Sequence, residues 1–159
     1  RFSKGCRLMI REIQEKDLTY QYFMLLSELS GNARHLEPIE TWTLWSTYQN
    51  PTLVFKSNAD RKTLVYEDDG KIIGTATAFI EHKFLHCGSR VGHIEDVVVD
   101  KNIRKSGIGK ALIKECIEFC RYRMCYKAIL DCSKENIPFY ECCGFTFSEN
   151  CMRINLGEK

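Results

Sequence analysis

The segment RKSGIG, residues 104–109, combines two glycines with basic residues between a run of valines and a long amphipathic segment. Such a loop at a helix start binds phosphate, because free N–H groups and the positive end of the helix dipole face the ligand and glycines admit it closely. Two nucleotide motifs fail here. A Walker loop requires glycine in place of Arg104 and a hydroxyl in place of Ala111, and the dinucleotide fingerprint requires glycine in place of Leu112. A diphosphate-binding loop and a plain strand-to-helix turn both remain as interpretations.

Two adjacent carboxylates, Glu95 and Asp96, interrupt the apolar segment HIEDVVVD. Carboxylates are costly to place in a buried strand unless they have a chemical task. The pair therefore indicates a functional site, with a solvated strand end as the alternative. Neighbouring side chains of a regular strand point to opposite faces, so both acids can serve one ligand only if a β-bulge interrupts the strand.

Hydrophobic periodicity predicts the elements that position these residues. The turn signal Asp68-Asp69-Gly70 joins two apolar stretches within residues 62–86 and predicts a hairpin. The valine-rich segment 91–100 predicts a central strand that is buried on both faces. The other expected elements are strands at 7–14, 125–133 (also buried), 145–150 and 151–156, and helices at 15–31, 38–50, 107–124 and 136–144.

This order of elements predicts a mixed α/β (α+β) fold, in which a twisted sheet of about six to seven strands is flanked by about four helices. The strands on either side of the helix at 107–124 should be parallel, because a crossover helix connects them. No repeat or linker divides the sequence. We therefore expect residues 1–159 to form a single domain.

The composition is that of an ordinary folded protein, with 44% hydrophobic residues, 28% charged residues and a formal net charge of +2. Basic residues are scattered, and no apolar run approaches the roughly 18 residues of a membrane span. The first residues do not resemble a secretory signal. We therefore expect neither nucleic acid nor a membrane as a partner.

Nine cysteines are many for 159 residues, but their odd number and the lack of a CxxC pair argue against a disulfide framework and a zinc ribbon. His82 and His86 would lie about 13 Å apart on a strand, too far for one metal ion. We expect no metal, and reduced, mostly buried thiols. These indicate the cytoplasm or another reducing intracellular compartment, with import into an organelle left open.

The loop RKSGIG is similar to the R/Q-x-x-G-x-G/A loop of the GNAT superfamily of acetyl-CoA-dependent N-acetyltransferases. The segments GHIEDVVVD, CYKAILDCS and NIPFYECCGF resemble motifs that the eukaryotic glucosamine-6-phosphate N-acetyltransferases carry in this order. The resemblance extends over roughly residues 8–153 and is strongest from 91 to 146. It implies the GNAT fold and acetyl-CoA as the co-substrate.

The resemblance also implies how coenzyme A is held. Backbone groups of the valine-rich strand would pair with the pantetheine arm, and the glycine loop would hold the pyrophosphate. Asn136 could contact coenzyme A, although an N-cap role at the start of its helix is an equal alternative. The implied coenzyme A ligands are Val97, Val98, Val99, Arg104, Lys105, Ser106, Gly107, Ile108, Gly109, Asn136 and Tyr140.

Glu95, Asp96 and Tyr140 are the catalytic residues that the resemblance implies. The two acids would hold the amine beside the thioester and assist its deprotonation, and the phenol would hydrogen-bond or protonate the departing thiolate. A packing aromatic is the alternative for Tyr140. The backbone N–H of Val97 would hold the oxyanion of a tetrahedral intermediate.

A further set of residues would bind the sugar phosphate if the resemblance holds. Ser30 replaces a threonine of the family, and Arg153 is displaced by about two positions, with Asn155 where relatives carry arginine. Lys83 and Arg153 also fit ordinary solvated charges. The implied substrate ligands are Ser30, Lys83, His86, Glu95, Asp96, Asp131 and Arg153.

The function implied is direct transfer of the acetyl group of acetyl-CoA to the amine of D-glucosamine 6-phosphate, in UDP-N-acetylglucosamine biosynthesis. Relatives are dimers with substrate sites across the interface, so we expect a homodimer. One alternative is a protein acetyltransferase for lysine or an N-terminus, which needs an open acidic peptide groove. The other is a non-catalytic acetyl-CoA-binding domain, in which Tyr140, Glu95 and Asp96 would have no joint purpose. The fold alone does not decide among these.

Overall fold

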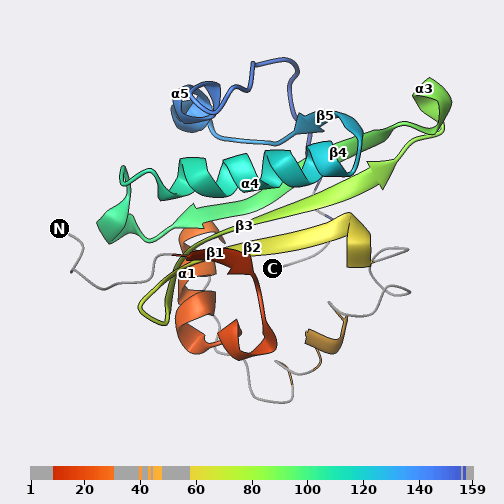
Figure 1. Ribbon diagram of the computed structural model, residues 1–159. Coiled ribbons are helices and arrows are strands. Elements are labelled where there is room, and N and C mark those ends of the chain that lie inside the picture. Colours follow the sequence, from red (N-terminus) through yellow and green to blue (C-terminus); the bar gives the residue numbers. More distant parts are fainter. Residues whose placement is uncertain are drawn as a thin grey trace.

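The computed structural model describes residues 9–30, 40, 43, 45–47, 58–154 and 156. At its centre is a five-stranded sheet in the order β1-β2-β3-β4-β5. Helix α4 (Ile108–Tyr122) covers one face of this sheet and α1 (Tyr20–Ser30) the other (Figure 1). The predicted mixed α/β fold is confirmed.

The central hairpin forms because the chain turns sharply at Asp69 and Gly70. Strands β2 (Arg61–Asp68) and β3 (Lys71–His82) pair antiparallel. The two turn residues have φ values of 50° and 79°, as a two-residue hairpin turn of this kind requires. Strand β1 (Met9–Glu12) adds antiparallel to β2. The predicted hairpin is confirmed.

The main core lies between the sheet and α4. Strand β4 (Arg90–Val99) pairs antiparallel with β3 and parallel with β5 (Cys125–Ile129), and α4 connects the two parallel strands. The α4 side chains of Leu112, Ile113 and Cys116 are fully buried against the sheet. Each large aliphatic side chain buried in this way contributes about 1.5–3 kcal/mol. The predicted parallel pair is confirmed.

Short helical elements connect the strands. The helix expected at 38–50 lies largely outside the described residues, although 40, 43 and 45–47 are helical. Helix α5 (Ile137–Glu141) follows β5 and lies beyond α4 in Figure 1. The remaining elements are η1 (Glu15–Asp17), η2 (Asn58–Asp60), α3 (Leu85–Gly88), η3 (Lys101–Ile103) and η4 (Lys134–Asn136).

Two expectations about the end of the chain are wrong. The segments 145–150 and 151–156 contain no strand at any residue that the structure describes, so the described sheet has five strands, slightly fewer than the expected number of about six to seven. Strand β5 lies at the edge of the sheet with Tyr126 and Ile129 exposed, and is not a buried strand. An apolar pattern predicts that side chains are buried against other apolar groups. It does not indicate whether those groups belong to the same chain or to a partner.

The cysteines within the described residues are all free. Cys116 and Cys120 are buried, whereas Cys87, Cys132, Cys142 and Cys151 are exposed. The expectation of mostly buried thiols is therefore wrong, because these four stand in connecting segments outside the core. No helix among the described residues is long and apolar enough to cross a membrane.

Candidate active site

A β-bulge in β4 positions the two central carboxylates. Thr77 pairs with Glu95 and Thr75 with Val98, so β4 has one more residue than β3 between these pairs. Asp96 takes a φ of 52°, a left-handed conformation that a bulge can accommodate. Both carboxylates are exposed, so the predicted burial of this strand on both faces is wrong here. The bulge that would let both acids serve one ligand is present.

One edge of β4 is open beyond the bulge. In the described part of the chain, the parallel ladder with β5 ends at the pair His93 and Ile129, although β4 continues to Val99. The backbone N–H and C=O groups of Val97–Val99 can therefore pair with an extended ligand in the manner of an added strand.

The loop at 104–109 has the backbone shape of a phosphate site. Lys105 and Gly107 have φ values of 66° and 88°, and Gly107 is the N-cap residue of α4. A Cβ atom on Gly109 would lie only 3.1 Å from Cζ of Phe139, so a side chain here would require the Phe139 ring to shift. The first N–H groups of α4 thus follow a loop with two basic residues and a glycine at the N-cap, which suits a diphosphate.

Arg104 is turned back toward β4 and α1. Its Nε donates to the carbonyl oxygen of Val99 at 3.1 Å, and its Nη2 donates to Oε2 of Glu28 at 2.7 Å. The Arg104 side chain is 55% exposed. An exposed pair of this kind is weak and open to exchange with an anionic ligand.

Tyr140 lies on α5 and its ring contacts two other aromatic rings. The ring centroids of Phe139 and Phe145 lie 4.9 Å and 6.1 Å from that of Tyr140. Burial raises the pKa of Tyr140 to about 12, and nearby thiols and Glu95 add to the rise. The phenol is therefore protonated at neutral pH and can donate a proton. Asn136 stands at the N-cap position of α5, but its side chain makes no capping bond.

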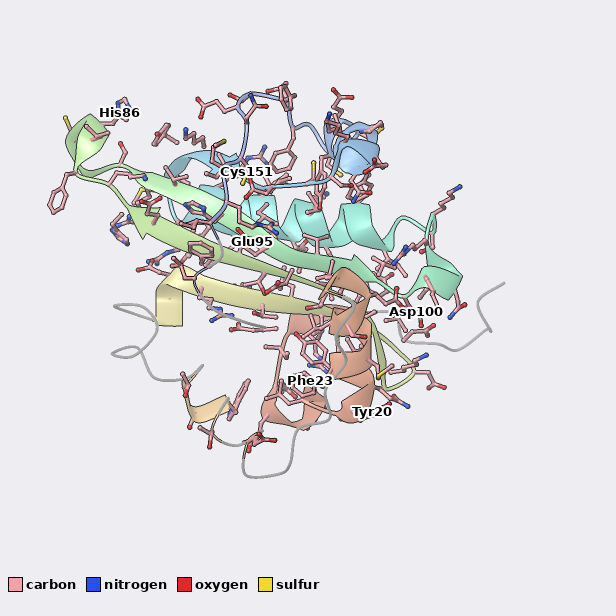
Figure 2. The ribbon with its side chains drawn as sticks, turned by 180° about the vertical axis from the view of Figure 1, so that it is seen from behind. Tyr20, Phe23, His86, Glu95, Asp100 and Cys151 are labelled. Atoms are coloured by element: carbon pink, nitrogen blue, oxygen red, sulfur yellow. The ribbon has the colours of Figure 1, made fainter. Side chains whose placement is uncertain are left out.

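Glu95 lies in an acidic neighbourhood. Desolvation raises the pKa of its carboxyl, and the charges of Asp96 and Asp131 raise it further. The thiol of Cys151 donates to Oδ2 of Asp131 at 3.2 Å, and Arg153 and Glu95 both act electrostatically on Cys151. Figure 2 shows Cys151 on the C-terminal segment close to Glu95. The structure thus brings Asp131 near Glu95, and Arg153 near Cys151.

Of the other predicted substrate ligands, Lys83 is linked to this region through Glu81, whereas His86 lies apart from it. Lys83 follows β3, and its Nζ donates to Oε1 of Glu81 at 2.5 Å. His86 has a φ of 51° in the turn between β3 and β4, and Figure 2 shows it at the tip of the molecule, far from Glu95. Ser30 ends α1, but its side chain lies outside the described part of the structure.

His93 and Glu81, which were not among the predicted site residues, also belong to this region. Nε2 of His93 lies 2.9 Å from Oε2 of Glu81, and the His93 ring stacks on Phe79 at a centroid distance of 4.5 Å. His93 precedes Glu95 by two residues and so shares its face of β4. The alternation within GHIEDVVVD is the sequence signal that identifies His93.

A cavity of about 180 Å³ lies between α1 and the sheet, beside Asp96. Its lining combines the aromatic rings of Tyr22 and Phe23 with the polar side chains of Arg61 and Thr77. Such a mixed lining suits a small molecule with both polar and apolar surfaces. Among the described residues, no three His, Cys, Asp or Glu side chains are grouped to hold a metal ion.

Comparison with known protein families gives a match to the acetyltransferase (GNAT) family over residues 17–145. A glucosamine 6-phosphate N-acetyltransferase from Trypanosoma brucei brucei is 38% identical over 149 residues, which cover 94% of this chain and 96% of that protein. A probable glucosamine 6-phosphate N-acetyltransferase 2 from Oryza sativa subsp. japonica is 34% identical, over 89% of this chain and 83% of that protein.

A similar result comes from solved structures. The crystal structure of glucosamine-6-phosphate N-acetyltransferase from Arabidopsis thaliana superimposes with a TM-score of 0.86 at 31% identity, covering 95% of this chain and 99% of that one. A Trypanosoma brucei acetyltransferase gives a TM-score of 0.82 at 38% identity, over 94% of this chain and 100% of that one.

Proposed function

The chain belongs to the acetyltransferase (GNAT) family, and we propose that it transfers the acetyl group of acetyl-CoA to the amine of D-glucosamine 6-phosphate. This reaction makes N-acetyl-D-glucosamine 6-phosphate, a precursor of UDP-N-acetylglucosamine. The observation that carries the chemistry is the bulge at Glu95 and Asp96, from which an open strand edge leads to the loop at 104–109. The similarity to glucosamine 6-phosphate N-acetyltransferases supports the choice of acceptor.

Acetyl-CoA matches two neighbouring features, the open edge of β4 and the loop at 104–109. Its pantetheine arm carries amides that match the open edge of Val97–Val99, where the Val99 carbonyl accepts from Nε of Arg104 in the single chain. Its pyrophosphate suits the first N–H groups of α4, with Lys105, Ser106 and Ile108 in the same loop. Arg104 would exchange Glu28 for the pyrophosphate, and Asn136 at the start of α5 is free of a capping bond that would compete.

Glu95 in the bulge and Tyr140 on α5 each carry out a different proton transfer. Glu95, supported by Asp96, takes one proton from the substrate ammonium, which leaves the nitrogen lone pair free to attack the thioester carbonyl. The backbone N–H of Val97 donates to the oxyanion that develops. As the C–N bond forms and the C–S bond breaks, Tyr140 gives its proton to the thiolate and regains one that the new amide nitrogen loses. No cysteine is needed as an acyl carrier.

The sugar phosphate needs cations, and their placement supports a homodimer. His86 lies far from Glu95 in one chain, whereas Asp131 acts electrostatically on Glu95. A second chain could bring its own cations and Ser30 to the cluster. The apolar side chains available for such an interface are Tyr126, Ile129, Phe147, Met152, Ile154 and Leu156, all exposed in the single chain.

The proposal also includes the cell compartment of the enzyme and the class of its partners. Free thiols at exposed positions such as Cys151 favour the cytoplasm or another reducing compartment. The small net charge of +2 and the scattered basic residues favour a small-molecule substrate over nucleic acid or a membrane surface.

Release of free thiol from acetyl-CoA tests the reaction. We expect rapid release with glucosamine 6-phosphate, slower release with unphosphorylated glucosamine and none with a lysine peptide. Mass spectrometry of the product should find one acetyl group on nitrogen. Activity on the peptide alone would identify a protein acetyltransferase, and binding of acetyl-CoA without turnover would identify a non-catalytic domain. Either result would overturn the proposal.

A further inference from the structure

A hydrogen-bonded chain of side chains runs along the sheet toward Glu95. Nζ of Lys83 donates to Oε1 of Glu81 at 2.5 Å, and Oε2 of the same carboxylate lies 2.9 Å from Nε2 of His93. The His93 ring also stacks on Phe79, with 4.5 Å between centroids and 5° between planes. The imidazole is thus fixed by a carboxylate on one side and by a ring on the other.

His93 and Glu95 share one face of β4. Phe79 pairs with His93 and Thr77 with Glu95 in the register of β3 and β4, so the two side chains are successive on this face. Two strand steps separate them by about 7 Å. The His93 side chain is 21% exposed, and a charge this little exposed is less screened than one at the surface.

His93 acts on the pKa of Glu95 in the direction opposite to the other groups around it. Desolvation raises the pKa of Glu95, and Asp96 and Asp131 raise it further, while His93 acts in the opposite direction. A protonated Glu95 could not take a proton from an ammonium ion. A cation that favours the carboxylate therefore favours the reactive form.

We propose that His93, held by Glu81, is a positioning residue that acts through Glu95 and keeps its carboxylate ready to accept the ammonium proton. The inference rests on the proposed function. In the step concerned, one N–H bond of the ammonium breaks and one O–H bond forms on Glu95, while His93 keeps its own protons. His93 does not need to touch either substrate for this role.

Other charged groups surround the pair and must be held constant in any test. They come from β2, β3, the bulge, the segment after β5, α5 and the C-terminal segment. They are Arg61, Glu81, Lys83, Asp96, Asp131, Tyr140, Cys151 and Arg153.

Two substitutions of His93 separate charge from shape. His93→Gln keeps a polar side chain but cannot carry a proton charge, whereas His93→Arg places a cation there at every pH. Carboxyl carbon NMR of the substrate-free protein, with the Glu95 signal assigned from Glu95→Gln, would report the titration directly. We expect His93→Gln to move the pKa of Glu95 further upward, because the one neighbour that lowers it is lost. His93→Arg should stay near the wild type.

The acidic limb of kcat/KM against pH should follow the NMR result. It should move upward by about the same amount in His93→Gln, and by less in Glu81→Gln, in which the ring loses its anchor. Lys62→Gln is a matched control, because Lys62 lies over Phe119 of α4 on the opposite face of the sheet. This control should leave the limb in place.

The outcomes separate this inference from the proposed function. If His93→Gln and His93→Arg lower activity equally and leave the Glu95 titration unmoved, His93 is only structural and the inference is wrong. If the Glu95 titration moves as expected but neither the wild type nor any variant acetylates glucosamine 6-phosphate, the coupling between His93 and Glu95 is supported. The proposed reaction is then wrong.

Discussion

Arg104 connects the phosphate loop to helix α1, because its Nη2 donates to Oε2 of Glu28 at 2.7 Å while its Nε donates to the carbonyl oxygen of Val99 at 3.1 Å. The same guanidinium is proposed to bind the pyrophosphate of acetyl-CoA. Glu28 and the pyrophosphate then compete for one cation. Since the Arg104 side chain is 55% exposed, the ion pair contributes only about 0–1 kcal/mol and can be displaced.

Substitution of Glu28 tests this competition. Glu28→Gln frees Arg104, and we expect the KM for acetyl-CoA to fall by up to about fivefold. Arg104→Gln should raise the same KM by about tenfold, because a charged contact to the ligand is lost. Glu118→Gln, which removes an exposed ion pair with Arg121 on α4, should change neither. A rise in KM for both Glu28→Gln and Arg104→Gln would mean that the pair only braces α1.

Removal of the Tyr140 hydroxyl tests its role as proton donor. Tyr140→Phe keeps the ring between Phe139 and Phe145, so binding of acetyl-CoA should change by less than about threefold. We expect kcat to fall about 100-fold, since proton transfer to the thiolate is lost. Tyr122→Phe, at an exposed position of α4, is the control for loss of a hydroxyl. Equal losses in kcat and in acetyl-CoA affinity would leave Tyr140 as a packing residue.

The elements with a strong local signal were predictable. The turn Asp68-Asp69-Gly70 fixed the hairpin because few residues adopt positive φ without strain. The parallel pair of β4 and β5 followed from the helix between them, since a crossover must span the sheet. The bulge at Asp96 was predictable only as a condition for two adjacent acids to share a ligand.

Contacts between distant segments were not predictable in the same way. Nothing near Arg104 in the sequence indicates Glu28, which lies 76 residues away. The exposed state of Ile129 on β5 also escaped prediction, because its apolar character indicates burial without identifying the partner. His93 could have been found by alternation from Glu95, but its link to Glu81 depends on the register of β3 and β4.

The exposed apolar side chains of the C-terminal segment predict a homodimer. Ile154 is 79% exposed in the single chain, and a charge at such an interface is costly. We expect light scattering to give twice the chain mass of 18.5 kDa, and Ile154→Asp to shift the protein toward monomer with a parallel loss of activity. Leu29→Asp, on the exposed side of α1, should remain dimeric. A fully active monomer would contradict a substrate site shared between chains.

A buried ion pair holds η1, the turn that precedes α1, against β1 and predicts a specific dependence of stability on pH. Asp17 is 6% exposed and accepts hydrogen bonds from Nη1 and Nη2 of Arg11 at 2.6 Å and 2.8 Å and from the backbone N–H of Gln14 at 2.8 Å. Burial alone would raise the pKa of Asp17, but these hydrogen bonds outweigh it and hold the pKa below its ordinary value. Folding is thereby linked to ionisation of this carboxyl.

The free energy of unfolding should report this link in Asp17→Asn. Because the folded pKa lies below the unfolded value of about 3.9, the carboxylate stabilises the fold fully above that value. We expect Asp17→Asn to lower the free energy of unfolding by about 2–3 kcal/mol at pH 7. The difference from the wild type should shrink as the pH falls below about 4. Glu15→Gln, at an exposed position in the same turn, should change the stability little. Urea unfolding between pH 3 and pH 7, followed by circular dichroism, measures all three proteins. A difference that stays constant down to pH 3 would show that the carboxylate charge of Asp17 does not contribute.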